Sequence, residues 1–178
     1  GFDWRPADGA LYGVEMGPDN EGGENIYFVQ PDPTGQLETG YGTEVTLTDD
    51  QPIAHGANAA ISWQDVTGDQ SDWFNPDNPT QISIPPKVSA ICIGGVVTFA
   101  SAAGGVRFVE VRVNGLHKQG LPKQTQPASG LSDSLNFASY RINVTAGDYV
   151  EVFVYQSSGA SVSLKSGNDT WLAVDKIA

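Results

Sequence analysis

Residues 146–156 read Ala-Gly-Asp-Tyr-Val-Glu-Val-Phe-Val-Tyr-Gln and are the most informative part of the sequence. A Gly-Asp turn is followed by strict alternation of apolar side chains, which predicts a β-strand. Two sets of side chains alternate along that strand: Val150, Val152 and Val154 face one side, and Tyr149, Phe153 and Tyr155 face the other. Because an antiparallel sheet that faces water is polar on one side, a strand that is apolar on both faces is expected to be covered on both.

The period of two continues along most of the chain. The strand over 106–113 is followed by Asn114-Gly115, the strongest short hairpin signal, and then by a polar loop over 116–134. No stretch shows apolar residues at helical spacing, so we expect no helix. Eight strands are predicted, over residues 57–63, 80–84, 88–100, 106–113, 139–144, 149–155, 161–164 and 171–177.

Eight short strands in one small domain predict a two-sheet sandwich, and a jelly roll is the usual eight-stranded arrangement. Several of these strands are apolar on both faces. In a chain of this size, the additional apolar face is expected to be covered by another copy of the same chain. We therefore expect an all-β jelly roll that forms a homo-oligomer.

The charge of the chain is concentrated at its N-terminal end. The 178 residues include 21 acidic and 9 basic side chains, for a formal net charge of −12, and residues 1–50 hold 11 of the acids against one base, Arg5. The apolar residues of this segment form only short islands. The sequence thus predicts an acidic, extended arm over 1–50 that orders on a partner, and a head domain over 51–178.

Composition also excludes several classes of protein. A net charge of −12 argues against partners such as nucleic acid and anionic membranes, both of which attract clustered Lys and Arg. Catalysis is not expected either, because His55 and His117 lie far apart in predicted loops and no Gly-x-Ser-x-Gly elbow is present. Cys92 is the single cysteine, which leaves it without an internal disulfide, and we expect an inert core residue there.

Four features occur in order along residues 57–178. They are Trp63 with the acidic loop after it, Val-Thr-Phe-Ala at 97–100 with Gly-Val-Arg at 105–107 and Val-Asn-Gly at 113–115, the stretch 146–152 with Val-Tyr-Gln-Ser-Ser-Gly at 154–159, and Thr-Trp-Leu-Ala-Val at 170–174. Together they resemble the jelly roll shared by tumour necrosis factor (TNF) and the globular head of complement component one-q. The variant that the sequence looks like is found in bacteriophage tail fibres and head fibres.

This resemblance implies a tight homotrimer with apolar sheet faces on the three-fold axis. The side chains that we assign to this interface are Tyr149, Phe153, Tyr155 and Trp171. The family leaves the role of the acidic arm open, because no collagen-like or coiled-coil stalk precedes the head. We predict that residues 1–50 anchor the head to capsid or tail proteins.

Two functions from different classes follow. The first is a non-enzymatic virion structural and interaction protein: a trimeric phage fibre, spike or capsid-decoration head at the virion surface, with receptor binding on a host glycan left open. The second is a soluble, secreted trimeric lectin or TNF/complement-like binding head. The sequence shows no signal-peptide pattern, no paired cysteines and no stalk, and these features favour the first.

Ligand binding is predicted in two loops. Trp73, Phe74, Asn75 and Asp77 combine an aromatic face with amide and carboxylate groups, which is the chemistry of a carbohydrate site. The alternative is that Trp73 folds back as a plug over the end of the sandwich. Asn114 and His117 begin the second loop, at the end of a sheet, where sandwich proteins commonly bind their ligands.

Calcium is the one cofactor that the sequence suggests. Asp65, Asp69 and Asp72 crowd into one loop, and calcium takes oxygen ligands from flexible acidic loops. Their spacing is not that of an EF-hand, so the alternative is a solvated acidic loop.

Overall fold

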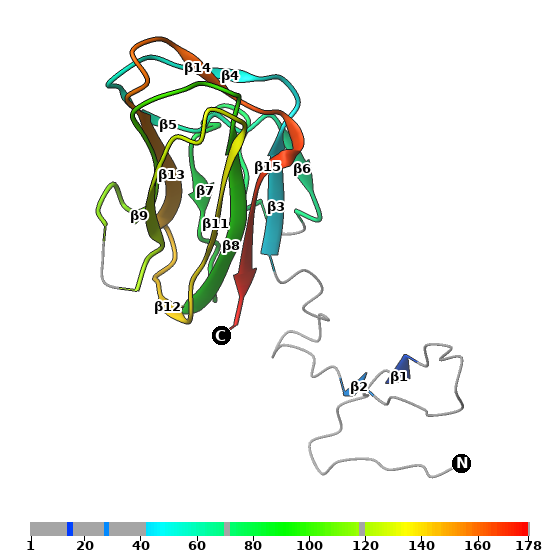
Figure 1. Cartoon of the computed structure of the whole chain (residues 1–178). Coiled ribbons are helices and arrows are strands. Elements are labelled where there is room, and N and C mark those ends of the chain that lie inside the picture. Colours follow the sequence, from blue (N-terminus) through cyan, green and yellow to red (C-terminus); the bar gives the residue numbers. More distant parts are fainter. Residues whose placement is uncertain (1–13, 16–26, 29–41, 70–71, 118–119, 178) are drawn as a thin grey trace, which may run out of the picture. The chain divides into compact units, whose positions relative to one another are not determined.

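The computed structural model describes residues 14–15, 27–28, 42–69, 72–117 and 120–177. The chain divides into two compact units, Gly1–Thr39 and Gly40–Ala178. In the first unit, β1 (Val14–Glu15) pairs with β2 (Tyr27–Phe28) in antiparallel fashion. The second unit, called the head below, contains the other strands (Figure 1).

The large sheet of the head is built around β8 (Ala90–Phe99) and β15 (Gly167–Lys176). β15 lies between β8 and β3 (Gly42–Leu47), while β11 (Asp133–Ala138) pairs with the opposite edge of β8. All of these pairings are antiparallel. The shorter strands of this sheet are β4 (Gln51–Ile53), β6 (Asp65–Thr67), β12 (Ile142–Asn143) and β14 (Val162–Leu164).

The small sheet is centred on β13 (Tyr149–Gln156), the strand that the opening stretch of sequence predicts. β13 pairs with β9 (Val106–Val113) along most of its length. Its other edge pairs with β5 (Asn58–Ala60) and β7 (Ile82–Ser83). β10 (Lys123–Pro127) extends the sheet beyond β9.

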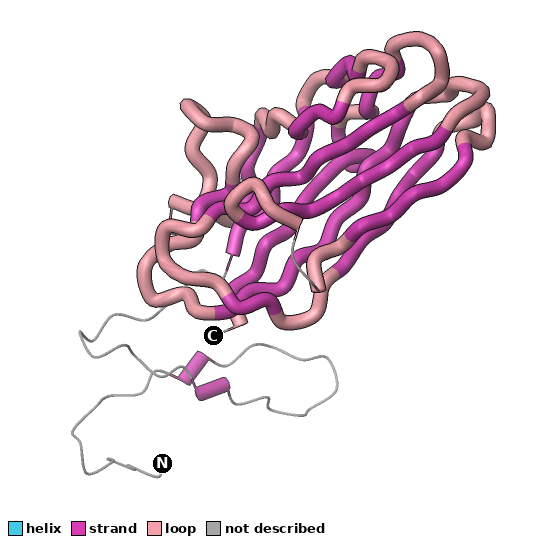
Figure 2. Tube along the Cα trace, turned by 90° about the vertical axis from the view of Figure 1, so that its left-hand side faces the viewer, coloured by secondary structure: helices cyan, strands magenta, loops and turns pink. Residues whose placement is uncertain are grey.

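The core fills the space between the two sheets. Val150, Val152 and Val154 on β13 are fully buried, as the alternation predicts, and they meet the inward side chains of β8 and β15, among them Leu172 and Val174. Strands run side by side along the head, and no helix occurs among the described residues (Figure 2). The predicted all-β, two-sheet jelly roll is confirmed. In the part of the chain that the structure describes, no helix is long and apolar enough to cross a membrane.

Several segments differ from the eight predicted strands. β4 and β6 form where no strand was predicted, and of the strand predicted over 57–63 only β5 forms. The loop predicted over 116–134 contains β10, whose side chains are nearly all exposed, so its strand conformation depends on backbone pairing with β9 and leaves no apolar pattern. The strand predicted over 139–144 is shorter, since only β12 forms there. The main pairing with that edge of β8 comes from β11, where buried Leu135 and Phe137 alternate with polar residues.

The boundary between arm and head also differs. The head begins at Gly40 rather than at residue 51, because β3 is an inner strand of the large sheet between β15 and β6. Val45 and Leu47 on β3 are buried in the core. Of the predicted arm, residues 1–39 form the separate unit, and most of them lie outside the described residues.

Candidate functional site

The outer side of the large sheet carries an apolar surface, which we call the large-sheet face. Because Leu172 and Val174 point into the core, Trp171 and Ala173 point outward. Trp171 stands beside Val96, and Ala173 beside Gly94, which is itself paired with Ala138 on β11. The large-sheet face consists of half-buried Cys92, Gly94, Val96, Trp171 and Ala173, and exposed Ala138.

Small side chains leave the middle of this face flat. Gly94 is open on its outer side, since a Cβ placed on it would meet no atom within 4 Å. Two carboxylates border the face, with Glu44 opposite Ala173 and Asp175 opposite Cys92. Burial raises the pKa of the Cys92 thiol, and the charge of Asp175 raises it further. Cys92 is therefore a half-buried thiol on the outer face, not the core residue that the sequence predicts.

The outer side of the small sheet, the small-sheet face, is aromatic and charged. Tyr149, Phe153 and Tyr155 are half-buried there, on the side of β13 opposite its core valines. The guanidinium of Arg112 on β9 stacks over the Phe153 ring at 3.8 Å from its centroid. This face is therefore amphipathic rather than apolar.

Glu110 organises the cations of the small-sheet face. Its Oε2 accepts hydrogen bonds from Arg112 Nη2 at 2.9 Å and Nε at 3.2 Å, and its Oε1 lies 3.5 Å from Lys123 Nζ and 3.4 Å from His117 Nδ1. Burial alone would raise the pKa of the Glu110 carboxyl, but the Arg112 hydrogen bonds and the charges of Arg112 and Lys123 outweigh burial and lower it. Glu110 is thus ionised at neutral pH, and both of its carboxylate oxygens contact basic side chains.

The four side chains predicted to form the oligomer interface lie on two different faces. Trp171 belongs to the large-sheet face, whereas Tyr149, Phe153 and Tyr155 belong to the small-sheet face on the opposite side of the sandwich. A single flat contact cannot include all four. The alternation within β13 was read correctly, but sequence alone does not tell which sheet a strand joins.

Trp73 is the plug and not the stacking platform. It is 1% exposed, packs in the core, and its Nε1 is buried without a hydrogen-bond partner. A sugar ring cannot stack on it without displacing the core. Phe74 is half-buried and bridges to Ile82, while Asn75 and Asp77 are exposed, and Asn75 Oδ1 accepts the backbone N–H of Asp77.

Two carboxylates of the predicted calcium loop, Asp65 and Asp69, accept hydrogen bonds from nearby backbone N–H groups. Asp69 accepts the backbone N–H groups of Trp73 and Phe74, each at 2.9 Å, and thereby holds the backbone at the buried Trp73. Asp65 Oδ1 accepts the N–H of Val66. Among the described residues, which include Asp72, no three or more acidic, His or Cys side chains gather into a cation site, so the calcium prediction gains no support.

Asn114 and His117 lie close to the end of β9. Asn114 has a positive φ of 54° in the hairpin turn, donates to Asp148 Oδ1 at 2.7 Å and accepts the N–H of Tyr149 at 3.0 Å, so its amide braces the turn. His117 is one-third exposed and faces Glu110 and the carbonyl of Val111. Both side chains are already engaged within the protein.

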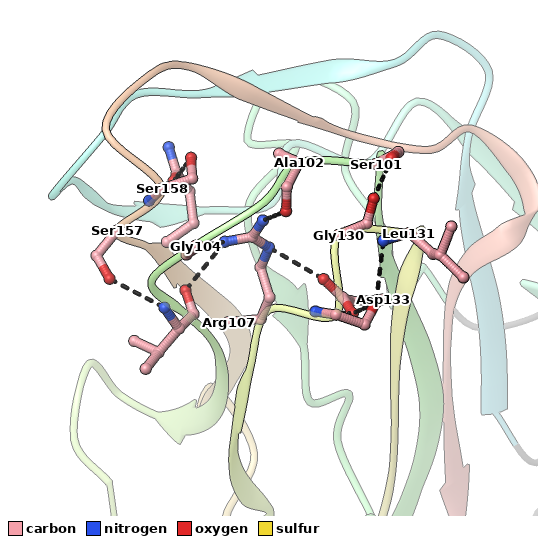
Figure 3. Close-up of polar contacts among 12 residues, drawn as sticks. Ser101, Ala102, Gly104, Arg107, Gly130, Leu131, Asp133, Ser157 and Ser158 are labelled. Atoms are coloured by element: carbon pink, nitrogen blue, oxygen red, sulfur yellow. Dashed lines mark hydrogen bonds and ion pairs between the residues drawn. The ribbon is translucent and has the colours of Figure 1, made fainter.

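A buried ion pair, Arg107 with Asp133, was not predicted from the sequence (Figure 3). Arg107 Nε lies 3.5 Å from Asp133 Oδ2, and the two side chains are 0% and 2% exposed. The signal was present, because Arg107 falls in register with the inward Val109 and Val111 of β9. An arginine at an inward position requires a buried acceptor.

Comparisons with known proteins bear on the fold alone. No protein-family model and no curated protein matches the sequence. Among solved structures, the chain is similar to the Eiger TNF of S. frugiperda, with 11% identity, a TM-score of 0.53, and coverage of 78% of this chain and 92% of that one. It is also similar to murine APRIL, with 12% identity, a TM-score of 0.54, and coverage of 77% and 99%. The globular domain of the zebrafish complement 1qA protein gives 9% identity, a TM-score of 0.53, and coverage of 78% and 98%. The TNF and complement side of the resemblance is thereby supported, while its phage variant is not.

Proposed function

We propose that this chain is a non-enzymatic binding head of the TNF/complement type, which assembles as a homotrimer through its large-sheet face. The observation that carries the proposal is an apolar, flat outer surface, made by Trp171, Val96, Gly94 and Ala173, on a head with this fold. A face of this kind on a sandwich is normally covered by a partner. The three-fold symmetry is taken from the family that the sequence resembles.

The charge distribution favours a second copy as the cover. Residues 40–178 hold 13 acidic and 8 basic side chains, a net charge of −5, so two heads repel each other modestly and approach most easily where charge is absent. Glu44 and Asp175 stand at the border of the large-sheet face rather than in its middle. The small-sheet face is less suited, because its centre contains the ionised Glu110 with its cations.

The test is the mass of the full chain in solution by light scattering at micromolar concentration, for wild type and two variants. Gly94→Glu places a charge in the middle of the large-sheet face, where the structure has room for it, and should convert trimers to monomers without unfolding the head. Tyr155→Glu makes the matched change on the small-sheet face and should leave the mass unchanged. A monomeric wild type, or dissociation by Tyr155→Glu alone, would refute the proposed assembly.

A narrower form of the proposal places the head at a virion surface, with its N-terminal unit bound to capsid or tail. The supporting observation is that residues 1–39 form a separate unit with eight acids against Arg5: Asp3, Asp8, Glu15, Asp19, Glu21, Glu24, Asp32 and Glu38. The test deletes residues 1–39, which keeps β3 in place, and measures incorporation into particles. Full incorporation of the shortened chain would refute the anchoring role.

The two predicted ligands of the head, carbohydrate and calcium, are tested by direct binding measurements. A glycan array probed with the full chain tests the carbohydrate prediction, now without Trp73 as its platform. Calorimetric titration with calcium chloride tests the metal prediction at Asp65, Asp69 and Asp72. Binding in either experiment that survives substitution of these loops would assign the ligand to another surface.

A further inference from the structure

Three loops at one end of the head contain no charged side chain. Residues 101–105, 128–132 and 157–160 consist only of Ser, Ala, Gly and Leu, in a chain with a net charge of −12. Hydrogen bonds link neighbouring loops: Ser101 Oγ donates to Gly130 O at 2.7 Å, Ala128 N to Gly105 O at 3.0 Å, and Val106 N to Ser157 Oγ at 3.0 Å. We call this surface the uncharged loops (Figure 3).

Buried Arg107 fixes the first of these loops. Its guanidinium donates to the carbonyls of Ala102 at 2.8 Å, Val106 at 3.3 Å and Gly104 at 3.5 Å. These bonds hold three carbonyls of one turn around a single planar group. The shape of residues 102–106 is therefore set from below by a side chain with no exposed surface.

Asp133 fixes the second loop from the other end of the ion pair. Its Oδ1 accepts the backbone N–H of Ser129 at 3.1 Å and the Ser129 hydroxyl at 2.5 Å. The Ser129 hydroxyl oxygen in turn accepts the N–H of Leu131 at 3.1 Å. A continuous chain of polar contacts thus runs from the core to the backbone of Leu131.

The buried ion pair is expected to contribute little net stability, because burying two charges removes their hydration. Replacing a buried ion pair with apolar side chains of similar size is often neutral or stabilising. Arg107 Nε and Asp133 Oδ2 even lack a hydrogen bond of ordinary length. What the pair does provide is a fixed loop conformation, and fixed loops bind without the cost of becoming ordered.

Leu131 stands on this fixed loop with 72% of its surface exposed. The other residues of its own loop and those of the neighbouring loop over 101–105 are only Ser, Ala and Gly, so their side chains leave the backbone accessible to a partner. Charged residues are depleted in the centres of protein interfaces, and a large apolar side chain there fills a pocket of the partner. We propose that the uncharged loops bind a protein partner that offers an uncharged, apolar pocket for Leu131.

Other classes of partner fit this surface less well. A sugar site needs an aromatic face or planar charged groups, and residues 101–105, 128–132 and 157–160 supply neither. An anionic membrane would be repelled by the net charge, and one leucine buries too few methylene groups to hold a protein on lipid. The surface also differs from the large-sheet face, so the proposal does not depend on the trimer.

The test uses a displayed library of random peptides as the probe. Peptides are selected on the full chain, and their affinity is then measured for wild type, Leu131→Asp and Leu116→Asp. Leu116 is the matched control, since it is 63% exposed in the turn after β9, outside the uncharged loops. We expect a major group of apolar peptides whose affinity falls at least about tenfold in Leu131→Asp and is unchanged in Leu116→Asp. If no selected peptide depends on Leu131, or if both variants act alike, the proposal is overturned.

A second variant separates the fixed loop from the leucine itself. The double substitution Arg107→Met with Asp133→Leu keeps Leu131 and an apolar filling below it. We expect faster hydrogen exchange in residues 128–132 and weaker binding of the same peptides, with the fold retained by circular dichroism. Unchanged affinity with faster exchange would refute the role assigned to the ion pair.

Discussion

Gly94 and Gly95 are neighbours on β8, yet they face opposite environments. A Cβ on Gly94 would meet nothing within 4 Å, whereas a Cβ on Gly95 would lie 2.6 Å from Cζ of Phe137 and 2.7 Å from the carbonyl oxygen of Trp171. The Phe137 ring from β11 therefore occupies the space that a side chain on Gly95 would take. One glycine allows the core to close, and the other keeps the large-sheet face flat.

Alanine at these two positions should have opposite effects on stability. Gly95→Ala forces Phe137 and a backbone carbonyl to move, and overpacking of this kind costs about 1–3 kcal/mol of unfolding free energy. Gly94→Ala meets no obstacle and should stabilise the strand by about 0.5–1 kcal/mol, since glycine costs entropy within a strand. Urea denaturation of both variants measures this difference, and a loss of stability in Gly94→Ala would contradict the open geometry.

The sequence predicted the strands with a clear period but not those without one. β9 was predicted with its observed bounds, because Val109, Val111 and Val113 alternate with polar residues. β10 was missed, since Lys123, Gln124 and Thr125 are exposed and only their backbone pairing makes them a strand. The composition of a segment does not show which distant strand its backbone pairs with.

The candidate sites were less predictable, because they depend on long-range placement. The loop around Trp73 has the composition of a binding site, but Asp69 accepts the backbone N–H of Trp73 and the indole lies in the core. The aromatic side chains of β13 and Trp171 look alike in sequence, although the two strands belong to different sheets. Arg107 was predictable from strand register, because an inward charge on an alternating strand implies a buried partner.

The ion pair of Arg107 and Asp133 predicts strong non-additivity. Arg107→Met alone leaves a buried carboxylate, and Asp133→Leu alone leaves a buried guanidinium, so each should cost about 3–5 kcal/mol of unfolding free energy. The double variant should cost clearly less than the sum of the two single losses. It should still be less stable than wild type, because it also removes the hydrogen bonds that Arg107 and Asp133 make to the two loops. A double-mutant cycle by urea denaturation measures the coupling, and additive losses would show that the two charges do not depend on each other.

The ion pairs of Glu110 make the free energy of unfolding depend on pH. Arg112 and Lys123 hold its pKa in the folded chain below the ordinary value of 4.5. A carboxyl with a lowered folded-state pKa stabilises the fold above 4.5, and this contribution is lost as the pH falls through the folded-state pKa. The stability difference between wild type and Glu110→Gln should therefore be larger at neutral pH than in acid. Urea denaturation midpoints of both proteins, measured from neutral pH to below the ordinary pKa of Glu110, test this prediction. A stability difference that does not change with pH would show that the ion pairs of Glu110 do not cause it.

Asp50 should titrate below its ordinary pKa of 3.8 for a local reason. Its carboxylate accepts the backbone N–H of Ser166 at 2.8 Å, then the Ser166 hydroxyl at 2.9 Å, and pairs with Lys165 Nζ at 3.1 Å, and together these contacts lower the pKa. The backbone hydrogen bond is the largest cause, so Lys165→Ala should recover only a minor part of the shift. Carboxyl-carbon NMR titration measures both midpoints. A return to the ordinary pKa in Lys165→Ala would show that charge, not the backbone bond, is responsible.

Cys92 reports on the large-sheet face without any change to the protein. Burial and the neighbouring Asp175 raise the pKa of its thiol, so little thiolate is present at neutral pH and alkylation by iodoacetamide should be slow in the folded chain. If the large-sheet face is covered in the trimer, Gly94→Glu should speed the reaction by removing that cover, and 6 to 8 M urea, at about the range that unfolds small domains, should speed it further. The rates are compared per thiolate, with the thiolate fraction of each variant measured by its absorbance, because the added carboxylate, like Asp175, raises the pKa of Cys92. Tyr155→Glu serves as the control and should leave the rate unchanged. Equal rates in wild type and Gly94→Glu, with wild type trimeric by light scattering, would place the contact between copies on another surface.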